Sequence, residues 1–282
     1  MNSKIKMCVA LSGALVLSAM VVHAQRRGPG GGGPFGAPME LMGFEGMHGG
    51  KTVTGAPFSA TATSETTQTL QDGSVIHRTS QVTMYRDSQG RSRQEATFTG
   101  FGPLAASGSP KTMITISDPV ASRHIMLDTV RKVARTSAFH TRGANRANGG
   151  GSAPAFEARM QAREQKEEAA GLLKKESLGT QTIDGVVVEG TRITHIIPAG
   201  QIGNDKPLQV VSERWYSPDL QIVLKSTRTD PRFGTTTYTV TSIQRTEPAA
   251  TLFTVPADYT VQAGGRGLYG RGPAPAAQPD DN

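Results

Sequence analysis

The chain contains little cysteine, few aromatic residues and only one long apolar run. Its one cysteine, Cys8, lies inside that run near the N-terminus. The remainder of the chain therefore has no disulfide, thiolate nucleophile or Cys-ligated metal, and an apolar core must hold it together. Aromatic residues make up 5% of the 282 residues. That is few for a base-stacking surface, so no nucleic-acid partner is predicted.

The N-terminal segment MNSKIKMCVALSGALVLSAMVVHAQ has the three parts of a secretory signal peptide. Lys4 and Lys6 form the positive region, an apolar run follows, and Val22 and Ala24 are the small residues before the cleavage site. We predict a signal peptide over residues 1–24 and a periplasmic or secreted protein with no transmembrane segment after cleavage. A retained membrane anchor is the alternative, which the Gly-rich segment that follows disfavours.

Charge and composition divide the rest of the chain. Loss of the two signal-peptide lysines lowers the formal charge from +7 to +5, which permits attraction to anionic lipid or polysaccharide. Residues 25–51 are rich in Gly, Pro and Met, and residues 262–282 resemble them, so both are predicted to be disordered. Between them we predict a single β domain, residues 52–261, with a flexible insertion at 140–154 and a helix at 155–175.

The β domain shows about eleven short strand patterns separated by turn signals such as Asp72-Gly73, Asp87-Ser88-Gln89-Gly90 and Asp184-Gly185. This spacing predicts a mainly β fold, an antiparallel meander that forms a curved sheet or part-barrel with one surface helix. The helix has a thin apolar stripe that ends in Leu172 and Leu173. It is interpreted as a connector packed by one edge or, alternatively, as a lid over the sheet.

Recognisable catalytic and metal-binding motifs are missing. The sequence has no His-Glu-x-x-His, no Gly-x-Ser-x-Gly and no calcium loop. His77, His124 and His195 fall in strand patterns without metal-ligand spacing. We therefore predict no catalytic residues, no metal and no cofactor, and a protein that is not an enzyme.

A basic stretch lies in the middle of the chain, with no acidic residue between Asp128 and Glu157. It could contact anionic lipid or lipopolysaccharide, or it could be a solvated loop whose charge bias has no role. The candidate contact residues are Arg131, Lys132, Arg135, Arg142 and Arg146.

The one tryptophan, Trp215, lies in the predicted hairpin ERWYSPDLQIVLKSTRTD. After the turn, Leu220, Ile222 and Leu224 are predicted to share one face, which leaves Gln221, Val223 and Lys225 on the other. Trp215 is interpreted as closing the end of a core, with an aromatic ligand platform as the alternative.

The second half of the domain resembles the periplasmic half-barrels that include the lipoprotein carrier LolA, the acceptor LolB and the regulator RseB. The resemblance rests on Trp215, the apolar strand 220–224, the charged turn 230–234, Tyr238, Ile243, Leu252-Phe253 and Pro256. It implies a LolA-like half-barrel without catalytic residues. The chain is also similar to uncharacterised secreted proteins of soil bacteria, which implies no activity.

Two main functions follow for a non-catalytic binding protein, and a third class, an enzyme with no recognisable motif, is disfavoured because no nucleophile, base or metal set is found. In the first, the part-barrel holds a lipid acyl chain or a lipidated partner such as a lipoprotein. In the second, the domain is a sensor or interaction module for another envelope protein. An apolar lining would favour the first, and an interior filled by side chains would favour the second. The candidate ligand-binding residues are Val211, Trp215, Ile222, Leu224 and Tyr238.

Overall fold

The computed structural model describes residues 52–98, 111–138 and 153–263. The predicted signal peptide, the segment 25–51, the candidate cations Arg142 and Arg146, and nearly all of the predicted C-terminal tail lie outside these ranges.

Twelve strands, one α-helix and one short 3-10 helix make up the described chain. In order they are β1 (Phe58–Thr69), β2 (Val75–Arg86), β3 (Ser92–Phe98), β4 (Lys111–Asp118), β5 (Arg123–Asp128), β6 (Val133–Ala138), α2 (Ala153–Ala169), β7 (Leu173–Ile183), β8 (Val186–Ile197), β9 (Leu208–Ser217), β10 (Ile222–Asp230), β11 (Gly234–Gln244), η2 (Ala250–Phe253) and β12 (Thr260–Ala263).

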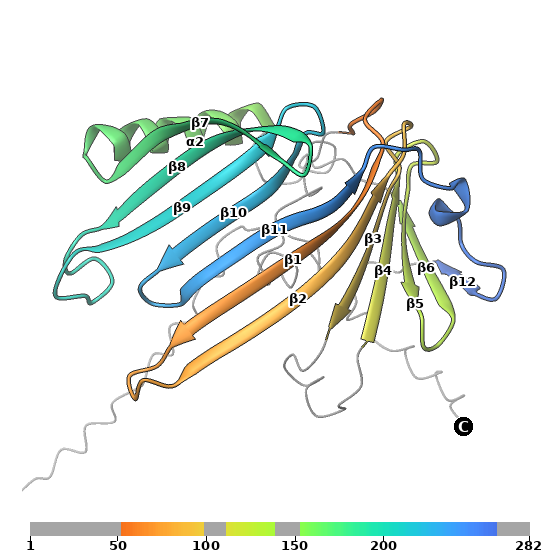
Figure 1. The fold of residues 1–282 in the computed structure, drawn as a ribbon, viewed down its shortest axis with the longest axis horizontal. Coiled ribbons are helices and arrows are strands. Elements are labelled where there is room, and N and C mark those ends of the chain that lie inside the picture. Colours follow the sequence, from red (N-terminus) through yellow and green to blue (C-terminus); the bar gives the residue numbers. More distant parts are fainter. Residues whose placement is uncertain (1–51, 99–110, 139–152, 264–282) are drawn as a thin grey trace, which may run out of the picture. The chain divides into compact units, whose positions relative to one another are not determined.

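All twelve strands belong to one open sheet, in the order β12-β6-β5-β4-β3-β2-β1-β11-β10-β9-β8-β7 (Figure 1). Two meanders, β1 to β6 and β7 to β11, meet where β1 pairs antiparallel with β11. The predicted mainly β, antiparallel sheet is thus confirmed, and it is not closed into a barrel. The twelfth strand was missed because β12 is short and exposed, and it pairs parallel with β6.

The helix begins and ends earlier than predicted. Ala153 and Pro154, expected in the flexible insertion, already belong to α2, which ends at Ala169. Gly171 adopts a positive φ of 67°, its N–H donates to Glu168, and the N–H of Leu172 donates to Glu167. This pair of bonds is a Schellman motif, which ends a helix at a left-handed glycine. Leu173 and Lys175, expected in the helix, therefore belong to β7.

The helix lies beside the edge strand. Glu164 of α2 is 2.8 Å from the ammonium of Lys175 on β7, and Glu167 is 3.6 Å from the imidazole of His195 on β8. All α2 residues from Ala158 to Ala169 are exposed or half-buried. These contacts agree with the interpretation of a connector packed by one edge.

The sheet buries opposite faces in its two halves. Val82 on β2 is in register with Ala96 on β3, and both belong to the first core, with Phe58 of β1 and Val240 of β11. On β4, however, the buried residues Ile114 and Ile116 are in register with Glu95 and Arg93 of β3. Side chains alternate along a strand, so Glu95 and Arg93 point to the face opposite to that of Ala96. The buried face therefore changes between β3 and β4.

The second core is covered by the chain after β11. Ile116, Ile125 and Leu127 pack against Phe253 of η2, with Leu252, Val255 and Tyr259 around them. Arg93 donates to the carbonyl of Leu252 at 2.8 Å, which fixes the cover to β3. A separate hydrogen bond lies beside the first core. The carboxylate of Asp184, in the β7–β8 turn, accepts it from the N–H of Ile243 on β11.

The second core makes a testable prediction about two phenylalanines. Phe253 is 0% exposed, so Phe253→Ala should lower the free energy of unfolding by about 3–5 kcal/mol, through lost transfer energy and the cavity left behind. Phe233 is 64% exposed in the β10–β11 turn, so Phe233→Ala should change stability by less than about 0.5 kcal/mol. Urea denaturation measures both, and equal effects would contradict the described cover.

Candidate functional site

Trp215 packs against the first core from the β9 side. It is half-buried and in register with Gly190 of β8. A Cβ atom added to Gly190 would lie 2.5 Å from Cζ3 of Trp215 and 2.8 Å from Cβ of Leu178. The ring therefore occupies the space that any side chain at position 190 would need. Sequence reasoning missed Gly190, although a glycine inside a strand pattern signals this kind of close approach.

Three of the candidate ligand residues are core residues. Ile222 is 2%, Leu224 0% and Tyr238 1% exposed. The hydroxyl of Tyr238 lies 3.9 Å from the sulfur of Met84, to which it donates. These three side chains pack within the first core and help to fill its interior.

The predicted face assignment after the turn was wrong at Val223. Val223 is buried in the first core together with Ile222 and Leu224. The register between β9 and β10 shifts between Val223 and Lys225, which marks a β-bulge. A bulge interrupts strict alternation, so consecutive residues can both face the core.

Val211 lies elsewhere on β9. It is half-buried and pairs with Thr194 of β8 and Thr229 of β10. Four of the five candidates, Trp215, Ile222, Leu224 and Tyr238, therefore meet at the first core, while Val211 has polar neighbours along the strand.

A buried arginine that the sequence did not reveal holds the edge of the first core. Arg86 donates to the carbonyls of Ala56 at 3.0 Å and Leu220 at 2.5 Å, and its guanidinium lies 4.8 Å from the centre of the Phe58 ring. Burial lowers the pKa of Arg86 to about 10, so it stays charged at neutral pH. It ties the β9–β10 turn to the chain before β1.

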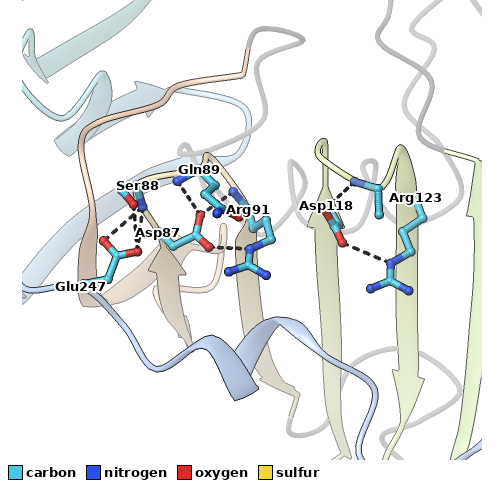
Figure 2. A network of polar contacts seen from close by, with 8 residues as sticks. Asp87, Ser88, Gln89, Arg91, Asp118, Arg123 and Glu247 are labelled. Carbon is cyan, nitrogen blue, oxygen red and sulfur yellow. Dashed lines mark hydrogen bonds and ion pairs between the residues drawn. The ribbon is translucent and has the colours of Figure 1, made fainter.

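Polar contacts hold the β2–β3 and β4–β5 turns (Figure 2). Asp87 is buried and accepts from the N–H groups of Gln89 and Arg91 and from the Arg91 guanidinium. Glu247 accepts from the N–H and hydroxyl of Ser88. Asp118 accepts similarly from Ala121 and Arg123. These carboxylates stabilise the turns through hydrogen bonds to backbone N–H groups and to arginine side chains.

The described cations of the basic stretch surround the β5–β6 turn. Arg131 is exposed and lies 3.6 Å from Asp128. Backbone N–H donation from Arg131 is the main cause that lowers the pKa of Asp128. Lys132 lies 2.9 Å from Asp258 and 5.0 Å from the centre of the Tyr259 ring, while Arg135 is half-buried on β6. All three cations belong to the β5–β6 hairpin, but their contacts differ from one another.

The histidines do not meet. The hydroxyl of Ser117 lies 3.1 Å from Nδ1 of His124, and His77 lies between Thr67 and Thr79. Within residues 52–98, 111–138 and 153–263, no group of three or more His, Cys, Asp or Glu side chains could hold a metal ion. No helix in the same ranges is long and apolar enough to span a membrane.

The fold defines a class of open, mainly antiparallel sheets with a helix beside one edge. Among solved structures, the chain matches one in the complex of MucA and MucB from Pseudomonas aeruginosa at 12% identity and a TM-score of 0.37, over 74% of this chain and 58% of that one. The LolA superfamily protein NE2245 from Nitrosomonas europaea matches at 8% identity and a TM-score of 0.28, over 71% and 90%.

The lipoprotein LppX from Mycobacterium tuberculosis matches at 12% identity and a TM-score of 0.26, over 69% and 90%. The predicted resemblance is thereby confirmed as a likeness of fold, and no activity follows from it. The chain spans less than two thirds of the length of the MucA/MucB match. No protein-family model and no curated protein matches the chain.

The contact between Trp215 and Gly190 predicts a steric effect. Gly190→Ala should destabilise the protein by about 1–3 kcal/mol, because the new methyl group overlaps the indole ring. It should also shift the fluorescence of the single tryptophan to longer wavelength as the ring moves outward. In a Trp215→Leu background the cost of the alanine should fall, since leucine can yield. An unchanged cost would show that the ring is not the obstacle.

The environment of His124 predicts a pH dependence. Burial lowers the pKa of His124 below its usual 6.5, so the unfolded chain binds more protons than the folded one as pH falls. Stability from this residue is present above about pH 6.5 and is lost as pH falls through the folded pKa. His124→Asn keeps a polar group near Ser117 without this titration. Urea denaturation from about pH 7.5 to 5 should show a flatter stability profile for the variant, and parallel profiles would contradict the assignment.

Proposed function

We propose that the protein is a non-catalytic binding module of the bacterial cell envelope that takes up an extended segment of a protein partner along the outer edge of β7. The observation that carries the proposal is the filled first core. Ile222, Leu224 and Tyr238 are buried against one another and against the rest of that core, so the described side chains leave these residues no surface for an acyl chain. A filled interior favours an interaction module over a carrier.

The edge of β7 supports this mode of binding. β7 is the last strand of the sheet, and no described strand pairs with its outer edge. Its first part is guarded, because Lys175 binds Glu164 and Glu168 of α2. Residues 179–182, Gly-Thr-Gln-Thr, are exposed and uncharged. Edge strands that must not pair usually carry charges or a cover, and an extended peptide can add to an edge that has neither.

The cell-envelope location rests on the predicted signal peptide and on the resemblance to periplasmic proteins. Burial of an acyl chain against Trp215 and Val211 remains the competing function, since both are half-buried and accessible. The two functions differ in the chemical class of the bound partner and in the elements that contact it.

The proposal predicts cross-linking from the β7 edge. A photo-reactive residue at Gln181, introduced into protein exported to a bacterial periplasm, should trap one protein, whereas the same residue at Gln209, exposed on the interior strand β9, should not. The trapped protein, purified and titrated, should bind Thr180→Lys/Thr182→Lys at least tenfold more weakly, a loss of about 1.4 kcal/mol. Thr191→Lys/Gln209→Lys is the matched control, because it places two lysines at exposed positions on β8 and β9, which are not edge strands.

Native mass spectrometry separates this from the competing function. Protein isolated without bound lipid supports the interaction module. A stoichiometric lipid that is lost in Trp215→Ala, together with no specific cross-link from Gln181, would overturn the proposal in favour of acyl-chain binding.

A further inference from the structure

The antiparallel connections sort the turns between two ends of the sheet. The β1–β2, β5–β6, β8–β9 and β10–β11 turns lie at one end, called here the Phe233 end, which comprises residues 70–74, 129–132, 198–207 and 231–233. The β2–β3, β4–β5, β7–β8 and β9–β10 turns lie at the opposite end. Figure 1 shows the β1–β2, β8–β9 and β10–β11 turns together at the left of the sheet.

Exposed large apolar side chains concentrate at the Phe233 end. Each of its four described turns has at least one, at or directly beside the turn, whereas among the four described turns of the opposite end only the β4–β5 turn has one, Val120. Those of the Phe233 end are Leu70, Val75, Val130, Ile202 and Phe233. Turns are normally polar, so an apolar residue in every turn of one end needs a reason.

Three of these turns are neighbours. The strands run β2-β1-β11-β10-β9-β8 without interruption, so the β1–β2, β10–β11 and β8–β9 turns follow one another along the end of the sheet. Gly234, which has a positive φ of 88°, lies so close to β1 that an added Cβ would overlap the carbonyl oxygen of Thr67. This contact brings the turn with Phe233 against the end of β1, which Leu70 follows in the chain.

The turn residues of the Phe233 end carry more cations than carboxylates, although Arg131, Lys132 and Arg232 also pair with Asp128, Asp258 and Asp230 beside the turns. Its four turns contain four cations, Arg131, Lys132, Lys206 and Arg232, and two carboxylates, Asp72 and Asp205. The guanidinium of Arg232 lies 5.0 Å from the centre of the Phe233 ring, so a cation stands beside the largest apolar tip. Asp230, which accepts from Arg232, is buried at the base of the turn.

We propose that the Phe233 end contacts the surface of an anionic lipid bilayer, with Leu70, Ile202 and Phe233 inserted among the headgroups. Apolar side chains carried on separate turns can each enter a fluid bilayer, which does not require a preformed complementary surface. The neighbouring cations add attraction to anionic headgroups. This contact lies outside the β7 edge and is independent of the proposed protein partner.

The test is co-sedimentation of the full chain, exported to a bacterial periplasm, with vesicles of phosphatidylethanolamine and phosphatidylglycerol. Leu70→Ser/Ile202→Ser/Phe233→Ser should lower the partition coefficient at least tenfold. The matched control is Val120→Ser/Val187→Ser/Tyr216→Ser, which removes three side chains of comparable exposure at or near the opposite end and should bind as the unaltered chain does. Circular dichroism melting establishes that both variants are folded, and mass spectrometry identifies the N-terminus.

Each outcome decides the proposal. Retained binding by the control with loss by the tip variant supports it, as does weaker binding to phosphatidylcholine vesicles. No binding by the unaltered chain overturns it, and so does equal loss in both variants. Tip substitutions that abolish self-association, measured by light scattering, without changing vesicle binding would assign this end to a second copy of the chain instead. If the tip variant does not fold, Phe233→Ser alone, at an exposed turn, repeats the comparison against Val120→Ser.

Discussion

The pairing of β1 with β11 is the constraint on which the rest of the structure depends. It joins residues about Ser59 to Thr67 with residues about Thr235 to Gln244, and it is the contact that makes two meanders one sheet. Arg86 reinforces this region, because it binds the carbonyl of Leu220 and stacks on Phe58 of β1. Such a long-range pairing must overcome a large loop-closure entropy before it stabilises the fold. The burial of apolar side chains from both strands in the first core offsets this cost.

The change of buried face between β3 and β4 explains an otherwise unusual composition. Each strand needs apolar residues on one face only, and the face that carries them differs between the two cores. Two covers then complete the burial. The β7–β8 turn is anchored by Asp184 to Ile243, and the segment after β11 is anchored by Glu247 to Ser88 and by Phe253 in the second core. Thr-rich strands with few aromatic residues are sufficient for this arrangement.

Local chemistry made much of the fold predictable. Asp184-Gly185 and Asp72-Gly73 form hairpin turns, as expected from residues that tolerate positive φ. Prediction failed where a distant contact decided the outcome. The helix was extended past Gly171 because Leu172 and Leu173 continued an apolar stripe that in fact enters β7. Val223 was placed on the wrong face because a bulge cannot be read from alternation, and Arg86 was missed because its partners are carbonyl groups distant in sequence.

The sequence by itself determined the strands, most of their turns, the antiparallel class and the absence of thiol chemistry after Cys8, because these depend on residues next to one another in the chain. Only the tertiary structure decided that Ile222, Leu224 and Tyr238 fill a core, that Trp215 lies over Gly190, and that apolar turns gather at one end of the sheet. Burial and neighbourhood are properties of strand order and register, and the same alternation of apolar and polar residues suits a filled core and an open cavity equally well.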